Sequence, residues 1–165
     1  MNERALERGP AEQLAERWRS AWLEPSPAAF AGCCSASIQY EDPVATEPLE
    51  GLDALARHAE RLHDAFPDMR VEPSAGAVVD SAHGCLPWRF IGTHRGAIGP
   101  LPATKRFVTL HGLHFVELAD GRVRRARGFF DLYDAAVQLG LLPGRGSLGE
   151  AAILFLRGFG FRPRA

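Results

Sequence analysis

A carboxylate that directly follows two aromatic residues is the strongest chemical signal in this sequence. Phe129 and Phe130 end a run with the two-residue period of a strand, and Asp131 comes next, before a segment of helical period. Apolar neighbours raise the pKa of a carboxyl group, and a raised pKa suits proton transfer. Asp is also a favoured N-cap residue, so a helix that begins after Asp131 explains the same position equally well.

Two histidines lie on the strand candidate 106–118, which we expect to pair with the strand that leads to Asp131. His111 and His114 are three residues apart, so strand alternation places them on opposite faces unless Gly112 forms a bulge. We favour His111 for the interior, because its neighbours on that face are largely apolar. An imidazole beside a buried carboxylate could relay a proton near neutral pH. The alternative for both histidines is a position on the sheet surface or at a dimer contact.

A tyrosine and a second carboxylate share one alternation phase at the end of a shorter strand candidate. Tyr40 could donate its hydroxyl to a developing enolate, with Asp42 beside it. An interior lined by aromatic rings and few polar groups suits a flat hydrophobic ligand such as a polyketide, although ordinary core packing explains most of these rings. The residues that we expect to contact a ligand are Tyr40, Asp42, Phe66, Trp88, Phe90, His114 and Phe129.

Composition excludes several classes of protein. The chain has 165 residues, of which 46% are hydrophobic, and its formal net charge of −1 argues against a nucleic-acid partner. The three cysteines and six histidines show no metal-ligand spacing, and no phosphate-binding loop, nucleophile elbow or dinucleotide fingerprint occurs. We therefore expect neither a metal nor a cofactor. The charged N-terminus and the absence of a long apolar run predict a cytoplasmic protein without a membrane partner.

The hydrophobic period divides the chain into an N-terminal helical part and a C-terminal part made of strands. On the third predicted helix we expect His58 and His63 to lie off the apolar face, in solvent, and we expect His94 to anchor a loop. The predicted helices are 11–23, 27–30 and 52–66, and the predicted strands are 37–40, 69–79, 85–93, 106–118 and 122–130.

Several short motifs occur in an order that resembles the SnoaL-like polyketide cyclases of the nuclear-transport-factor-2-like superfamily. They are Tyr-Glu-Asp-Pro at 40–43, Ala-Phe-Pro-Asp at 65–68, Gly-Thr-His-Arg-Gly at 92–96, Phe-Asp at 130–131 and Gln-Leu-Gly-Leu-Leu-Pro at 138–143. The resemblance covers about residues 14–143. It implies an α+β fold, a cone-shaped barrel whose curved antiparallel sheet carries the helices on its concave face. We expect one domain over 1–143 and a partly helical extension over 144–165.

The same resemblance implies a function for Asp131. In those cyclases an acidic residue on the last strand is the general acid/base, and by motif position it corresponds here to Asp131. From its place on the neighbouring strand, we expect His111 to assist it. The implied activity is cofactor-independent cyclisation or isomerisation of a small hydrophobic carbonyl compound, by a homodimer formed through the sheet. The alternatives are a non-catalytic ligand-binding or dimerisation module, or an epoxide hydrolase or dehydratase. The loop 102–106 and the extension depart from the family pattern.

Overall fold

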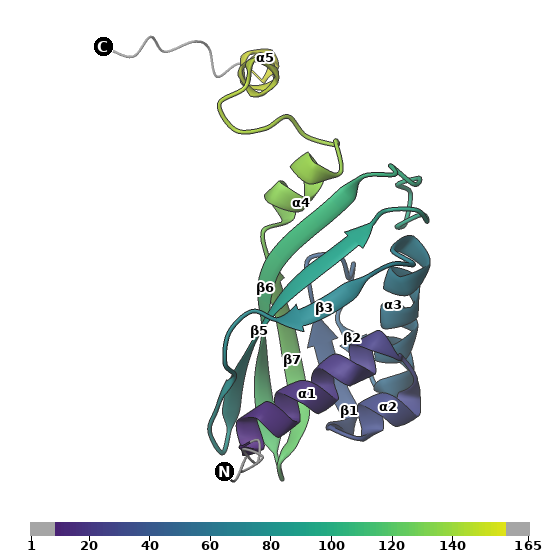
Figure 1. The fold of residues 1–165 in the computed structure, drawn as a ribbon, viewed down its shortest axis with the longest axis vertical. Coiled ribbons are helices and arrows are strands. Elements are labelled where there is room, and N and C mark those ends of the chain that lie inside the picture. Colours follow the sequence, from purple (N-terminus) through teal and green to yellow (C-terminus); the bar gives the residue numbers. More distant parts are fainter. Residues whose placement is uncertain (1–8, 158–165) are drawn as a thin grey trace, which may run out of the picture.

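A curved seven-stranded sheet with three helices on one face makes up most of the molecule (Figure 1). The computed structural model describes residues 9–157. The charged N-terminus from which a cytoplasmic protein was predicted lies outside this range. The strand order is β2-β1-β7-β6-β5-β3, with β4 paired to β5, so the sheet runs from one edge to the other without closing. This architecture confirms the expected α+β class.

The elements follow one another along the chain as α1 (Pro10–Leu23), α2 (Pro27–Ala31), β1 (Cys34–Glu41), β2 (Leu49–Glu50), α3 (Leu52–Ala65), β3 (Arg70–Pro73), β4 (Val78–Val79), β5 (His83–Thr93), β6 (Phe107–Ala119), β7 (Arg122–Phe130), α4 (Leu132–Gln138) and α5 (Leu148–Leu156).

The long strands β5, β6 and β7 form an antiparallel meander that is the structural centre of the sheet. The first strand, β1, pairs with β7 in parallel, so the sheet is antiparallel at every pairing except this one. The predicted strand 69–79 is in fact two short strands, β3 and β4, because the Ser-Ala-Gly-Ala segment between them does not pair. This unpaired segment lines a cavity beside β5.

The N-terminal helices begin and end within one residue of their predicted bounds. Ser26 caps α2 by accepting a hydrogen bond from the Ala29 N–H, and Pro27 occupies its first turn. Gly51 precedes α3 with a φ of 83°, a conformation that a residue with a side chain rarely adopts. Leu14, Trp18 and their apolar neighbours on α1 pack against the sheet and form the main hydrophobic core with α2 and α3.

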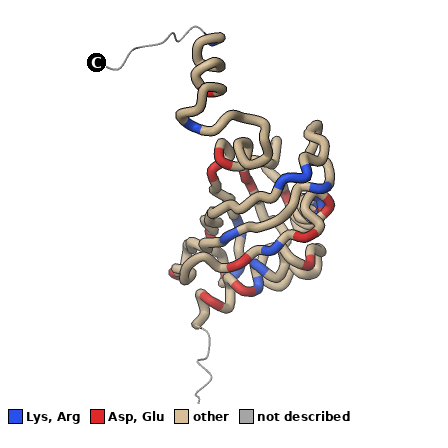
Figure 2. Tube along the Cα trace, turned by 45° about the horizontal axis from the view of Figure 1, so that its top comes forward, with Lys and Arg blue, Asp and Glu red and all other residues tan. Residues whose placement is uncertain are grey.

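The C-terminal helix α5 extends away from the body of the molecule (Figure 1), and its Leu148 and Leu156 side chains are 90% and 83% exposed. Acidic and basic positions are interspersed over the rest of the chain (Figure 2). No helix within residues 9–157 is long and apolar enough to cross a membrane.

Candidate active site

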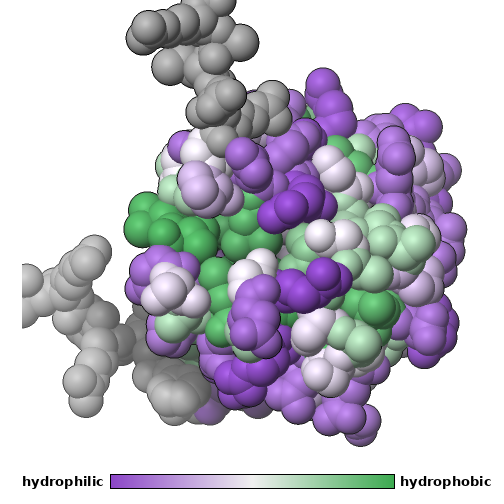
Figure 3. Space-filling model, turned by 90° about the horizontal axis from the view of Figure 1, so that it is seen from below, coloured by the Kyte–Doolittle hydropathy of each residue, from purple (hydrophilic) through white to green (hydrophobic). Residues whose placement is uncertain are grey.

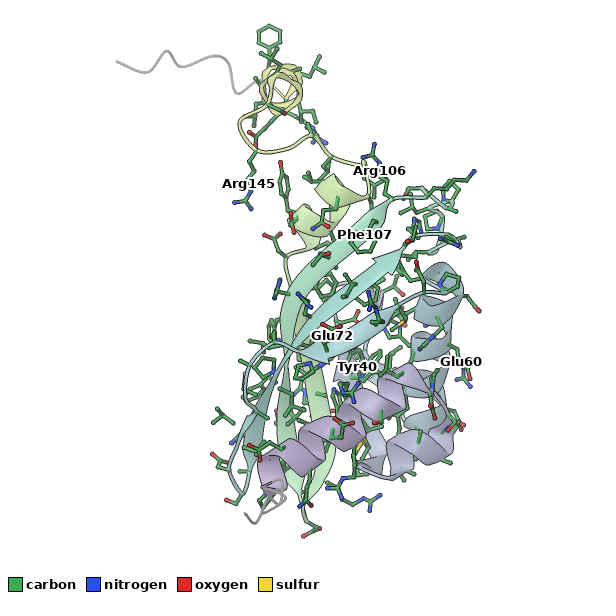
Figure 4. All side chains as sticks on the ribbon, in the orientation of Figure 1. Tyr40, Glu60, Glu72, Arg106, Phe107 and Arg145 are labelled. Carbon is green, nitrogen blue, oxygen red and sulfur yellow. The ribbon has the colours of Figure 1, made fainter. Side chains whose placement is uncertain are left out.

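Five side chains from four elements and one turn form a continuous hydrogen-bonded chain between the helices and the sheet. Trp18 Nε1 of α1 lies 3.1 Å from His114 Nδ1 of β6, and His114 Nε2 lies 3.2 Å from the hydroxyl of Tyr40 on β1. The Tyr40 hydroxyl donates to Asp42 Oδ2 across 3.0 Å, and His58 Nε2 of α3 contacts the same oxygen at 2.8 Å. Figure 4 labels Tyr40 beside α1.

The hydrogen-bond partners of the two imidazoles fix the direction of every hydrogen bond in this series. An indole N–H can only donate, so Trp18 makes His114 Nδ1 an acceptor and leaves the proton on Nε2. His114 Nε2–H then donates to Tyr40, and Tyr40 donates to Asp42. On the other side, Arg61 Nη2 lies 3.4 Å from His58 Nδ1, and because Arg can only donate, His58 presents Nε2–H to Asp42. All donors therefore point toward the Asp42 carboxylate.

Asp42 is held as a buried anion by a turn as well as by these side chains. Its Oδ1 accepts from the backbone N–H groups of Val44 and Ala45, each at 2.7 Å, in the Asx geometry typical of an Asp-Pro turn. Burial alone would raise the pKa of Asp42, but the hydrogen bond from His58 and those from the two backbone N–H groups outweigh it and lower the pKa. The carboxylate is thus ionised at neutral pH although its side chain is only 5% exposed.

The other two polar groups at this point are neutral. Burial lowers the pKa of His114 to about 3, with the charge of Asp42 opposing the shift. Burial, followed by the charge of Asp42 and the hydrogen bond to it, raises the pKa of Tyr40 well above its usual range. One carboxylate therefore stands beside a neutral imidazole and a neutral phenol, and both of these are hydrogen-bond donors.

Two glycines make room for this arrangement on the sheet. A Cβ on Gly128 would lie 2.9 Å from the Tyr40 hydroxyl, and a Cβ on Gly112 would lie 2.4 Å from Cζ2 of Trp88. Both residues face the interior, so a side chain at either position would displace a ring of the site.

A cavity of about 230 Å³ opens onto the network. Tyr40, Asp42 and His114 line it together with many apolar side chains, among them the predicted Phe66, Trp88 and Phe90 and the unpredicted Phe130. Leu132 and Leu141 also line it and are each 50% exposed, so the cavity opens beside α4. Its size and composition suit a small apolar ligand with one polar group.

The structure places Asp131 and Phe129 outside this cavity. Strand alternation turns Gly128 and Phe130 inward, and it therefore turns Phe129 and Asp131 outward. The Asp131 side chain is 56% exposed, and its Oδ1 accepts from the Asp134 N–H at 2.9 Å as the N-cap of α4. Of the two interpretations of Asp131, the helix cap is the one that the geometry shows.

The structure also corrects the prediction that His111, rather than His114, faces the interior. His111 and His114 do lie on opposite faces, as alternation requires, but His114 is the buried one and His111 is exposed. The interior set on β6 includes Gly112, His114 and Val116, whereas the outer set with His111 ends in Glu117. The absence of a charged residue from the first set was the available signal.

The expectation that the α3 histidines are solvated is wrong. His58 is 3% exposed, and His63 Nε2 contacts the Trp22 carbonyl at 2.8 Å. His58 lies three residues after Leu55 and four before Leu62, so helical spacing alone puts it on the apolar face. His94 does anchor its loop, because its Nδ1 accepts from the Thr104 N–H at 3.1 Å.

Within the described range, no three His, Cys, Asp or Glu side chains gather as metal ligands would. The chemical capability that the geometry does show is proton transfer. A buried carboxylate lines an apolar cavity, with two neutral donors beside it and a second imidazole behind it.

Comparisons with known proteins give one family model and several solved structures of the same fold. The model of the SnoaL-like polyketide cyclase family matches residues 12–139. Among solved structures, TsrD from Streptomyces laurentii superposes with a TM-score of 0.71 at 23% identity, over 83% of this chain and 99% of that one. A Catenulispora acidiphila protein with a ketosteroid isomerase-like fold, in complex with trimethylamine, gives 0.65 at 16% identity over 78% and 93%. No curated protein matches the chain.

Proposed function

Because this chain belongs to the SnoaL-like polyketide cyclase family, we propose that it is a cofactor-independent acid/base enzyme for a small apolar carbonyl compound. The observation that carries the proposal is the ionised Asp42 at the wall of an otherwise largely apolar cavity, with the Tyr40 and His114 donors beside it. The reaction class is cyclisation or isomerisation, and a polyketide ring system has the required chemistry.

In this mechanism Asp42 removes a proton from the carbon next to the ligand carbonyl. The C–H bond breaks, the proton moves to Oδ2 of Asp42, and the electron pair moves to the carbonyl oxygen as an enolate. Asp42 is then neutral, so the Tyr40 hydroxyl loses its charged acceptor and can turn to the enolate oxygen. Return of the proton from Asp42 to another carbon completes an isomerisation. In a cyclisation the enolate carbon instead attacks a second carbonyl, the C–C bond forms as the C=O π bond opens, and the resulting alkoxide takes the proton from Oδ2 of Asp42.

His58 is a positioning residue in this account. Its Nε2–H holds Asp42 Oδ2 at 2.8 Å, and its Nδ1 is held in turn by Arg61. This pair fixes the orientation of the carboxylate and keeps it ionised before the ligand arrives.

One observation favours a ligand-binding module without catalysis as the second candidate. Both oxygens of Asp42 already accept two hydrogen bonds each, as a purely structural carboxylate would. The two candidates differ in whether the protein accelerates proton exchange.

The test uses deuterium exchange into the α-carbon positions of 2-tetralone, a compact bicyclic ketone, in D₂O followed by proton NMR. The enzyme proposal expects exchange faster than the buffer rate with the wild type and not with Asp42→Asn. Binding of the ketone without accelerated exchange would contradict the enzyme proposal and support the binding module.

A further inference from the structure

A second cavity, of about 530 Å³, lies between α1, residues 71–77 and β5. It exists because the segment between β3 and β4 does not pair with β5 along its whole length. Its apolar lining includes Ala15 and Trp18 from α1, Ala77 from the loop and Leu86 from β5. The surface seen from below has apolar side chains between hydrophilic ones (Figure 3).

Three of the four charged side chains in this lining have an oppositely charged partner. Arg19 pairs with Glu16 at 2.5 Å, and it also donates to the Val71 carbonyl at 3.4 Å, which ties α1 to β3. Glu72 pairs with Arg89 of β5 at 2.5 Å. The cavity therefore favours an apolar occupant over a charged one.

The second cavity adjoins the cavity of the candidate active site. Four residues, Trp22, Val71, Trp88 and His114, line both of them. They form a partition, and the imidazole that contacts Tyr40 is part of it. A ligand held beside Tyr40 and Asp42 is thus separated from the second cavity by a single layer of residues.

Two of the partition residues are not fixed by hydrogen bonds. The indole nitrogens of Trp22 and Trp88 are buried, and neither has a hydrogen-bond partner within residues 9–157. His114, in contrast, is held on both sides by Trp18 and Tyr40. A buried N–H without an acceptor is unfavourable, so a ligand oxygen at the partition would be stabilised by either indole.

We propose that the ligand has two parts, a compact carbonyl-bearing ring group in the site cavity and an apolar chain that crosses the partition into the second cavity. This inference rests on the proposed function, because it assigns the second part of the same ligand. It predicts that the protein selects for the length of the substituent and not only for the ring group.

Two fluorescent ketones that differ only in chain length test the inference. Prodan carries a propionyl group and laurdan a dodecanoyl group on the same dimethylaminonaphthalene ring, and both report transfer to an apolar site by a blue shift. We expect the wild type to bind laurdan at least about tenfold more tightly than prodan, because each buried methylene adds affinity.

Filling the second cavity should remove only the preference for the long chain. Ala15→Phe and Ala77→Phe place a ring in it from opposite walls, and each should abolish the tighter binding of laurdan while leaving prodan affinity within about twofold. Ala28→Phe is the matched control, because Ala28 is exposed on α2 and lines neither cavity. Thermal melting of each variant checks the fold.

The outcomes separate this inference from the proposed function. Equal affinity of the wild type for the two ketones, or a laurdan preference that survives both filling variants, would overturn the two-part ligand while leaving the site cavity intact. Failure of prodan itself to bind would overturn both proposals. Loss of the preference in both filling variants and not in Ala28→Phe supports the inference.

Discussion

The Trp18 indole N–H donates to Nδ1 of His114 across 3.1 Å and thereby decides which nitrogen of that imidazole carries its proton. The consequence is a one-way series of donors that ends on Asp42. Because the pKa of His114 is lowered to about 3 by burial, this ring is a neutral donor at every pH at which the protein is expected to work.

The shift at His114 predicts an acid-dependent loss of stability. The unfolded ring takes up a proton near its usual pKa of 6.5, whereas the folded ring does so only near pH 3. The unfolded state binds more protons than the folded state in this pH window. Protonation of His114 in the unfolded state therefore lowers the free energy of unfolding as pH falls. Between pH 7 and pH 5 it should cost about 2 kcal/mol.

Urea unfolding at both pH values checks this prediction. His114→Gln should lack this part of the pH dependence, whatever its stability at pH 7, and His111→Gln should keep it because His111 is exposed. An identical pH dependence in the wild type and His114→Gln would show that the ring is not held neutral by burial.

Gly112 is expected to tolerate no side chain. A Cβ there would lie 2.4 Å from Trp88 Cζ2 and 2.5 Å from the Phe129 carbonyl oxygen, so Gly112→Ala should destabilise the fold by about 1–3 kcal/mol. Gly76→Ala is the control, because a Cβ at Gly76 meets nothing within 4 Å. Chemical denaturation measures both, and equal stabilities would mean that Trp88 does not lie over Gly112.

The cap at Asp131 predicts a difference between two substitutions at one position. Asp131→Ala removes the acceptor for the Asp134 N–H and should cost about 1 kcal/mol, whereas Asp131→Asn keeps an acceptor and should cost little. Thermal unfolding of the two variants measures the difference. A loss of equal size in both would argue against capping.

Dimerisation through the outer face of the sheet remains a prediction. Phe115 and Phe129, on the neighbouring strands β6 and β7, are 41% and 46% exposed, and a partner sheet would cover them. Light scattering after gel filtration should find a dimer for the wild type and a monomer for Phe129→Glu. Val78→Glu, at a position 73% exposed on β4, should stay dimeric. A monomeric wild type would contradict this prediction.

The fold was predictable because its signals are local. The 3.6-residue period of α1 and α3, the Ser26-Pro27 cap of α2 and the two-residue period of β5 to β7 each act within one element. The parallel pairing of β1 with β7 was not predictable in this way, since it joins two strands that are far apart in the sequence.

The site was only partly predictable, because a residue belongs to it only if its side chain points from its strand or helix into the interior. Tyr40 and Asp42 were identified from their shared phase, and Trp88 and Phe90 from theirs. On β6 both faces are mostly apolar, and only Glu117, which shares the face of His111, distinguishes that face from the face of His114. His58 was missed because it was placed off the apolar face of its helix, whereas its spacing from Leu55 and Leu62 puts it on that face, where Asp42 supplies its partner.

Deuterium exchange into 2-tetralone, measured with Asp42→Asn and Asp131→Asn side by side, tests the central claim most directly. Both substitutions replace a carboxylate by an amide of the same shape, one in the cavity and one at an exposed cap. Prodan binding by each variant verifies that the cavity is intact. We expect Asp42→Asn to lose at least about a hundredfold in exchange rate, the usual share of a general base, and Asp131→Asn to match the wild type. Undiminished exchange in Asp42→Asn, or its loss in Asp131→Asn alone, would contradict the assignment of Asp42 as the base.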